Sequence, residues 1–200
     1  MKSFYRIALT GGAAAGKSSV LRMLKQMRTN EKIKVIFLDE TATVFFHNRP
    51  AAVSALDSPL LRQHYIVKTQ THIEDLLLEY AVDSERPTVI VSDRGAADAM
   101  VYLSDEDFNK LGIDANNLIS RYDFVIHLEG SENNFVHNDS TTTRIEENYD
   151  EVNSTANRSR HIWSKHKSFS VICQKDTIEE KVTEVVKTIN ALIGTEVFVL

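Results

Sequence analysis

A glycine-rich segment near the N-terminus has the spacing of a phosphate-binding loop. Residues 11–18 read Gly-Gly-Ala-Ala-Ala-Gly-Lys-Ser and match the pattern G-x-x-x-x-G-K-[ST] at every fixed position. The glycines allow backbone N–H groups to surround phosphate oxygens, and the helix that follows points its positive end at them. We expect Lys17 to reach the β- and γ-phosphates and the Ser18 hydroxyl to bind Mg²⁺. The motif predicts these nucleotide-binding residues: Gly11, Gly12, Ala13, Ala14, Ala15, Gly16, Lys17, Ser18 and Ser19.

A second candidate for the Mg²⁺ site is Asp93. This acid follows the apolar run Thr88–Ser92, and the carboxyl ends of parallel strands are where open α/β sheets bind ligands. We therefore expect Asp93 to hold Mg²⁺ together with Ser18, directly or through water. Alternatively, Asp93 caps a helix that begins near Gly95, a role that is compatible with metal binding.

Two adjacent acids, Asp39 and Glu40, follow another apolar run. Neighbouring side chains on an extended chain point in opposite directions, so only one of them is expected to face the site. We assign that position to Glu40, where a carboxylate could accept the proton of a substrate hydroxyl or hold the sugar or base of the substrate. In the alternative interpretation both acids are solvated turn residues.

Strands and helices alternate along the chain, as in a βαβ architecture with a parallel sheet. The runs predicted as strands are mostly apolar without alternation, which is typical of strands buried on both faces. They are Phe4–Thr10, Ile33–Leu38, Thr88–Ser92, Tyr122–Leu128 and a fifth candidate, Phe169–Cys173. Helical spacing is found over Ser19–Met27, over Leu60–Ala81, and from an N-cap at Asp176 or Thr177 to Gly194.

Composition restricts the class of protein. The 200 residues are predicted to form a single domain over residues 1–200, with 42% hydrophobic and 26% charged residues. A net charge of −5 argues against a nucleic acid polymer as partner. The single cysteine, Cys173, fits a reducing compartment, so we expect a cytoplasmic protein. Without a signal-peptide pattern or an unbroken apolar run of about 18 residues, secretion and membrane binding are both disfavoured.

These motifs together resemble the P-loop nucleoside and nucleotide kinase-like families. The likeness is greatest to the AAA-domain ATP-binding group that includes the ribosylnicotinamide kinase domain of the bacterial NAD-regulator protein. It rests on TGGAAAGKS at 10–18, Glu40, DRGAAD at 93–98 and RYDFVIHL at 121–128. The resemblance implies a three-layer α/β P-loop NTPase fold with a five-stranded parallel sheet of order 2-3-1-4-5. In related kinases the arginine of the D-R pair contacts the acceptor or the phosphates, which implies such a role for Arg94, supported by Asp98.

The resemblance also implies an arginine-bearing lid between the fourth and fifth strands, at about residues 130–167. A lid arginine would neutralise the charge that develops on the transferred phosphoryl group. Arg144, Arg158 and Arg160 match this role, although each could instead be an exposed helix residue. Arg158 and Arg160 are two positions apart, so on a helix only one of the pair is expected to face the site. The catalytic set that we predict is Lys17, Glu40, Asp93, Arg94, Arg144 and Arg158.

The function predicted from these residues is ATP- and Mg²⁺-dependent phosphoryl transfer to a nucleoside-like or nucleotide-like small molecule, with a homodimer as a further option. Side chains that could line an acceptor pocket are Phe45, Phe46, His47, Arg49 and Tyr65. The alternative is a P-loop ATPase that acts as a regulatory switch, in which ATP orders the polar segment Glu129–Thr143 to recruit a protein partner. A GTP-specific protein is a weaker option, because Gln174-Lys175-Asp176 only partly matches a guanine-reading motif.

Overall fold

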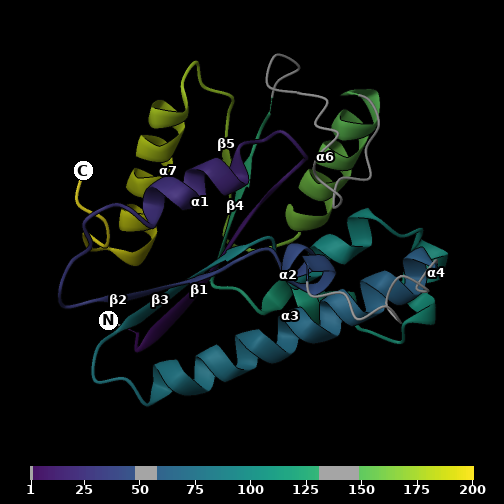
Figure 1. Cartoon of the computed structure of the whole chain (residues 1–200), viewed down its shortest axis with the longest axis horizontal. Helices are drawn as coiled ribbons and strands as arrows, with labels where there is room; N and C mark the ends of the chain where they lie inside the picture. The colour runs from purple at the N-terminus through teal and green to yellow at the C-terminus, as the bar shows by residue number, and fades with distance from the viewer. Residues whose placement is uncertain (1, 48–57, 131–148) are drawn as a thin grey trace.

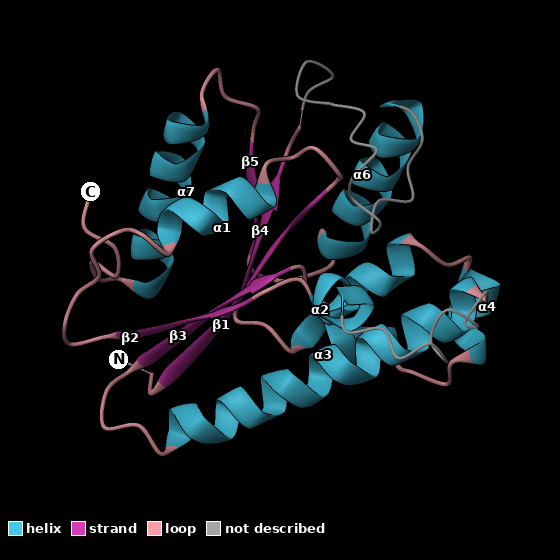
Figure 2. Ribbon diagram, viewed as in Figure 1, coloured by secondary structure: helices cyan, strands magenta, loops and turns pink. Residues whose placement is uncertain are grey.

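The computed structural model describes residues 2–47, 58–130 and 149–200, and its centre is a five-stranded parallel sheet. The strands are β1 (Phe4–Gly11), β2 (Lys34–Leu38), β3 (Thr88–Asp93), β4 (Phe124–Leu128) and β5 (Phe169–Ile172). They lie in the order β2-β3-β1-β4-β5, and every neighbouring pair is parallel (Figure 2). The α/β class, the five strands and the order 2-3-1-4-5 are thereby confirmed.

Helices cover both faces of this sheet, so the fold has three layers (Figure 1). Helices α1 and α7 lie together on one face, and α3, α6 and the 3₁₀-helix η2 lie on the other. The helices are α1 (Lys17–Leu24), α2 (Thr41–His47), α3 (Pro59–Val82), η2 (Ala96–Val101), α4 (Asp105–Lys110), α5 (Ala115–Ser120), α6 (Tyr149–Trp163) and α7 (Ile178–Ile193). Among the described residues, none of these helices is long and apolar enough to cross a membrane.

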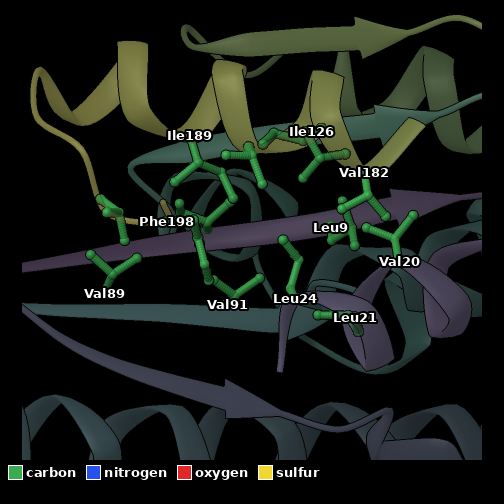
Figure 3. Packing of buried hydrophobic residues seen from close by; sticks show 14 of the residues in the cluster. Leu9, Val20, Leu21, Leu24, Val89, Val91, Ile126, Val182, Ile189 and Phe198 are labelled. Atoms are coloured by element: carbon green, nitrogen blue, oxygen red, sulfur yellow. The ribbon is translucent and has the colours of Figure 1, made fainter. Parts of the chain in front are cut away.

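Apolar side chains fill the space between the sheet and helices α1 and α7 (Figure 3). Leu24 from α1 and Ile189 from α7 are completely buried there against Leu9 and Val91 of the central strands. Because the central strands β1, β3 and β4 are buried on both faces over most of their length, their side chains are mostly apolar without alternation, as the sequence predicts. This packing fixes the C-terminal end of β1, from which the glycine-rich loop starts.

The last helix begins and ends where the sequence places its limits. The Thr177 hydroxyl accepts a hydrogen bond from the Glu180 N–H, and the Glu180 carboxylate accepts one from the Thr177 N–H, which is a capping box. Gly194 ends the helix in the left-handed region. The tail that follows forms a single antiparallel bridge, between Phe198 and Thr29, and Phe198 is completely buried.

Helix α3 is oriented in an unusual way for an amphipathic surface helix. Its inward positions carry the polar residues Gln63, Gln70 and Glu74, all buried, together with Val67 and Ala81. Four of the apolar residues that repeat along its sequence are at least 43% exposed: Leu61, Tyr65, Leu76 and Tyr80. The polar side chains of this helix therefore face the end of β3 and η2, where they need hydrogen-bond partners.

The core on the α1–α7 side is expected to dominate the stability of the protein. Leu24→Ala should lower the free energy of unfolding by about 2–5 kcal/mol, because a fully buried leucine leaves a cavity. Leu76→Ala is the matched control, since Leu76 also lies on a helix but is 50% exposed, and should change it by about 0.5 kcal/mol or less. Chemical denaturation measures both values, and similar losses in the two variants would contradict this view of the core.

Candidate active site

The glycine-rich loop lies against the end of strand β4. Gly11 adopts a φ of 141°, and a side chain there would place its Cβ 2.3 Å from the backbone oxygen of Leu128. Ala14 adopts the left-handed region with a φ of 61°, which is strained for a residue with a side chain. The loop leads into α1, so its backbone N–H groups and the helix N-terminus can both serve an anion.

Lys17 lies within this loop. Its side chain is buried, and Nζ donates hydrogen bonds to the backbone oxygens of Gly11 at 2.9 Å and Gly12 at 2.7 Å. Burial lowers the pKa of Lys17 to about 8, and the nearby guanidinium of Arg94 acts in the same direction. Asp93 and Glu40 oppose the shift, so Lys17 is a cation at neutral pH.

Asp93 and Ser18 are brought together as the sequence predicts. The Ser18 hydroxyl lies 3.4 Å from Asp93 Oδ2, and the other oxygen, Oδ1, is buried and accepts no hydrogen bond from any described residue. Burial raises the pKa of Asp93, although Lys17 and Arg94 counteract it. Such an unpaired carboxylate oxygen beside a hydroxyl fits Mg²⁺, which typically takes one or two protein ligands and completes its shell with phosphate oxygens and water.

Glu40 faces the site and Asp39 does not. Glu40 Oε1 accepts a hydrogen bond of 2.6 Å from Arg94 Nε, and Oε2 accepts one of 2.7 Å from the Thr43 hydroxyl. Asp39 is exposed and pairs with Lys25. Burial alone would raise the pKa of Glu40, but the charge of Arg94 and the hydrogen bonds from Thr43 and Arg94 hold it below its usual value.

Arg94 connects Glu40 to the glycine-rich loop. Its Nη1 lies 3.4 Å from the backbone oxygen of Gly11, and its guanidinium is 5.7 Å from the centre of the Tyr102 ring. The residue has a φ of 69°, and its N–H donates to the Leu9 oxygen at 2.9 Å. Arg94 therefore leaves the end of β3 through a strained turn that directs its side chain toward the loop.

Asp98 supports the site in a different way from the one expected. The sequence predicts that it supports Arg94, which lies four positions earlier, but η2 starts only at Ala96, so the two do not share a helix. Asp98 Oδ1 instead accepts a 2.7 Å hydrogen bond from the Thr10 hydroxyl, and Oδ2 accepts one of 2.9 Å from the Gly95 N–H. The N-cap of η2 is therefore Gly95, with Asp98 as the side chain that accepts from its N–H, so Asp93 does not cap this helix.

Helix α6, the described part of the expected lid, packs directly on the loop. A Cβ on Gly12 would lie 2.6 Å from the Cβ of Ala156, so only glycine permits this approach. On the same helix, the Ser159 hydroxyl lies 3.2 Å from the Thr10 hydroxyl. These contacts bring the helix that carries Arg158 and Arg160 to the nucleotide side of the sheet.

The two arginines of α6 have different partners. Arg158 does not reach the loop: its guanidinium donates to the backbone oxygens of Met100 and Leu103 and to Asp105, at 2.7–2.9 Å. Arg160 points the other way and donates to Glu129 Oε1 at 2.6 Å. The next residue, Gly130, lies against the backbone of Ala14 in the loop. Arg158 is therefore held by structural contacts and its predicted catalytic role stays a prediction, whereas Arg160 is bound to the residue that precedes Gly130.

Several predicted residues lie outside the described part of the chain. Arg144, Arg49 and most of the segment Glu129–Thr143 fall within residues 48–57 and 131–148, and the side chains of Phe45, Phe46 and His47 are likewise not described. Tyr65 lies on α3 and is 43% exposed. The aromatic acceptor pocket and the switch segment therefore remain predictions.

Sequence reasoning missed one buried cation at the site, Lys181 of α7. Its Nζ donates to the backbone oxygens of Ala15 at 3.2 Å and Glu129 at 2.7 Å, and to Gln174 Oε1 at 2.8 Å. Burial lowers its pKa, opposed by Glu129. A signal was present, since Lys181 occupies the apolar face of α7 next to Val182 and three positions after Ile178.

Comparison with known proteins agrees with this geometry. A family model described as "AAA domain" matches residues 6–181. Among 204 matching chains of solved structures is deoxyadenosine kinase from M. mycoides with bound dATP. It is 16% identical, with a TM-score of 0.60 over 93% of this chain and 99% of that chain, so it shares the fold. The search of curated proteins found no match.

The lowered pKa of Lys17 predicts a pH-dependent affinity for nucleotide. Below about pH 8 the charged ammonium attracts phosphate oxygens, and above that pH the neutral amine does not. The affinity for ATP should therefore fall as the pH rises through 8, by up to about tenfold for each pH unit. Calorimetric titrations of wild type and Lys17→Met test this, and an equally steep decline in Lys17→Met would assign the effect to another group.

Proposed function

Since the chain belongs to the AAA domain family that its sequence matches, we propose that it is a Mg²⁺-dependent kinase that transfers the γ-phosphoryl group of ATP to a nucleoside-like small molecule. The observation that carries this proposal is the Glu40–Arg94 pair beside the loop. Binding and releasing ATP as a switch requires no such carboxylate, whereas a hydroxyl acceptor requires a group that can take its proton. The shared fold with a deoxyadenosine kinase supports a nucleoside-like acceptor.

On this proposal the phosphate chain lies along residues 11–18. Backbone N–H groups and the N-terminus of α1 hold the phosphate oxygens, and the Lys17 ammonium turns from the Gly11 and Gly12 carbonyls to the β- and γ-phosphates. Ser18 and Asp93 would hold Mg²⁺, which supplies positive charge to the phosphate oxygens. Burial strengthens each of these electrostatic interactions relative to water.

The acceptor approaches from the side of Glu40. A hydroxyl oxygen of the acceptor forms a bond to the γ-phosphorus as the bond to the ADP oxygen breaks, and the hydroxyl proton passes to Glu40. Because Arg94 and Thr43 lower the pKa of Glu40, the carboxylate is ionised and ready to accept a hydrogen bond. Arg94 spans the distance between Glu40 and the Gly11 carbonyl, so it orients the carboxylate relative to the loop.

Acceptor screening tests the reaction. ATP consumption with Mg²⁺ is measured with nucleosides, nucleotides and nicotinamide riboside, and one acceptor is expected to stimulate turnover strongly. Lys17→Ala should lower that turnover by about 10²–10³-fold. Glu40→Gln should lower kcat by about 10²–10⁴-fold while ATP binding is retained. If no acceptor stimulates phosphate transfer, the kinase proposal fails, and slow acceptor-independent turnover would favour the ATPase switch.

The two arginines of α6 form a matched pair for a second test. Arg160→Met should lower kcat by on the order of 10²–10³-fold, because we place Arg160 as the lid arginine that stabilises the transferred phosphoryl group. Arg158→Met should leave kcat close to wild type and lower the free energy of unfolding by about 1 kcal/mol, since its hydrogen bonds are structural. Steady-state kinetics and denaturation measure the two effects, and the opposite pattern would restore Arg158 as the catalytic arginine.

A further inference from the structure

The inner face of α3 carries a carboxylate that the reaction as proposed does not use. Glu74 lies in the middle of this helix and is only 1% exposed. Glutamate is rarely buried to this extent unless it is fully paired. A carboxylate at this position therefore requires hydrogen-bond partners, and these partners show which side chains Glu74 orients.

Three donors satisfy Glu74. Its Oε1 accepts hydrogen bonds from Gln70 Nε2 at 2.9 Å and from the Tyr122 hydroxyl at 2.6 Å. Its Oε2 accepts one of 2.9 Å from Arg121 Nε, in a salt bridge between α3 and the segment before β4. Because both carboxylate oxygens are engaged, the carboxylate has a single orientation and fixes that of the Gln70 amide.

The Gln70 amide is hydrogen-bonded to Arg94 itself and to the residue next to Glu40. Its Oε1 accepts a hydrogen bond from the hydroxyl of Thr41, the residue after Glu40. Its Nε2 also lies 3.3 Å from the backbone oxygen of Arg94. One side chain thus holds the start of α2 and the turn after β3 at a fixed separation.

Tyr122 secures the same turn from its other side. Its hydroxyl accepts a hydrogen bond of 2.6 Å from the N–H of Ala96 while it donates to Glu74. The backbone of Arg94, with its φ of 69°, is therefore held on both sides by side chains that share Glu74 as their partner. A strained conformation of this kind persists only where the surroundings fix it.

We propose that Glu74 is a positioning residue for phosphoryl transfer, which acts through Gln70 and Tyr122 to hold Glu40 and Arg94 in register with the phosphate loop. This inference rests on the proposed function, since it assigns Glu74 to the acceptor side of that site. Lys17 and the loop have no hydrogen bond to Glu74 among the described residues. A positioning role therefore predicts a loss of kcat without a loss of ATP affinity.

Glu74→Gln tests this with little change in shape. The new amide can no longer accept from all three donors, so the Gln70 amide is expected to lose its fixed orientation. A displacement of about 1 Å at the reacting groups costs on the order of 10²-fold in rate, and we expect a decrease in kcat of that size with a KM for ATP within about twofold of wild type. The matched control is Asp75→Asn, since exposed Asp75 pairs with the same Arg121 but shares no hydrogen bond with Gln70 among the described residues, and its kcat should be unchanged.

Gln70→Met keeps the test decisive if Glu74→Gln does not fold. Methionine leaves the Glu74–Arg121 salt bridge in place and removes the hydrogen bonds of Gln70 to Thr41, Arg94 and Glu74, so kcat should fall as in Glu74→Gln. Gln70→Glu should also lower kcat, because a carboxylate cannot donate a hydrogen bond to the Arg94 oxygen. A purely structural Glu74 would instead give variants that are less stable but have wild-type kcat.

A readout without turnover separates this inference from the proposed function. The Nε–H of Arg94, which donates to Glu40, should give a protected NMR signal in wild type and in Asp75→Asn. In Glu74→Gln or Gln70→Met its exchange with water should be at least about tenfold faster. Unchanged exchange overturns the positioning role even where a kinase is found, and faster exchange supports it even where no acceptor is phosphorylated.

Discussion

Four charged side chains, two buried and two partly buried, lie together at the carboxyl end of the sheet, and the rest of the site depends on how their charges balance. Lys17 and Arg94 are the cations, and Asp93 and Glu40 are the carboxylates. Arg94 is bound to Glu40, which leaves Lys17 and the free oxygen of Asp93 available for a ligand. The environment moves the pKa values of the two carboxylates in opposite directions, up for Asp93 and down for Glu40. Such a separation is how a site gives chemically identical groups different roles.

Strand register explains why these charges meet. Leu9 is paired with Asp93 and Leu38 with Ser92, so β1, β2 and β3 end at the same edge of the sheet. Arg94 directly follows the end of β3, Glu40 is the second residue after β2, and the phosphate loop follows β1. Helices α7 and α6 complete the arrangement from opposite layers: Lys181 holds the Ala15 carbonyl, and Ala156 packs on Gly12. The loop is thus held by both helical layers.

The sequence predicts the features that local patterns determine, namely the strands and the phosphate loop. It does not predict the features that depend on how helices pack against other elements. Apolar runs predicted all five strands because the central ones are buried on both faces and the edge ones are partly buried along their length. The motif at 11–18 depends on the backbone of its own residues. Arg158 and Arg160 are two residues apart on α6, so the sequence predicts that they point in different directions. It does not predict which of them faces the loop, because that depends on how the helix is rotated against Gly12. The buried face of α3 was not predictable either, since hydrophobic periodicity assumes that the apolar side is the one that packs.

Several residues whose backbone conformation or burial is unfavourable for their residue type lie near one another, around the phosphate loop and the turn after β3. Ala14 and Arg94 are the chain's described non-glycine residues with positive φ; Ala14 lies in the phosphate loop, and the Arg94 side chain reaches the Gly11 oxygen of that loop. Lys181 breaks the apolar face of α7 where that helix meets the loop, and Glu74 breaks the inner face of α3 where it meets the turn after β3. Each exception lowers the intrinsic stability of its own element, so packing alone would have selected against it. Their common location indicates selection for the geometry of this edge of the sheet, where a nucleotide and an acceptor would meet.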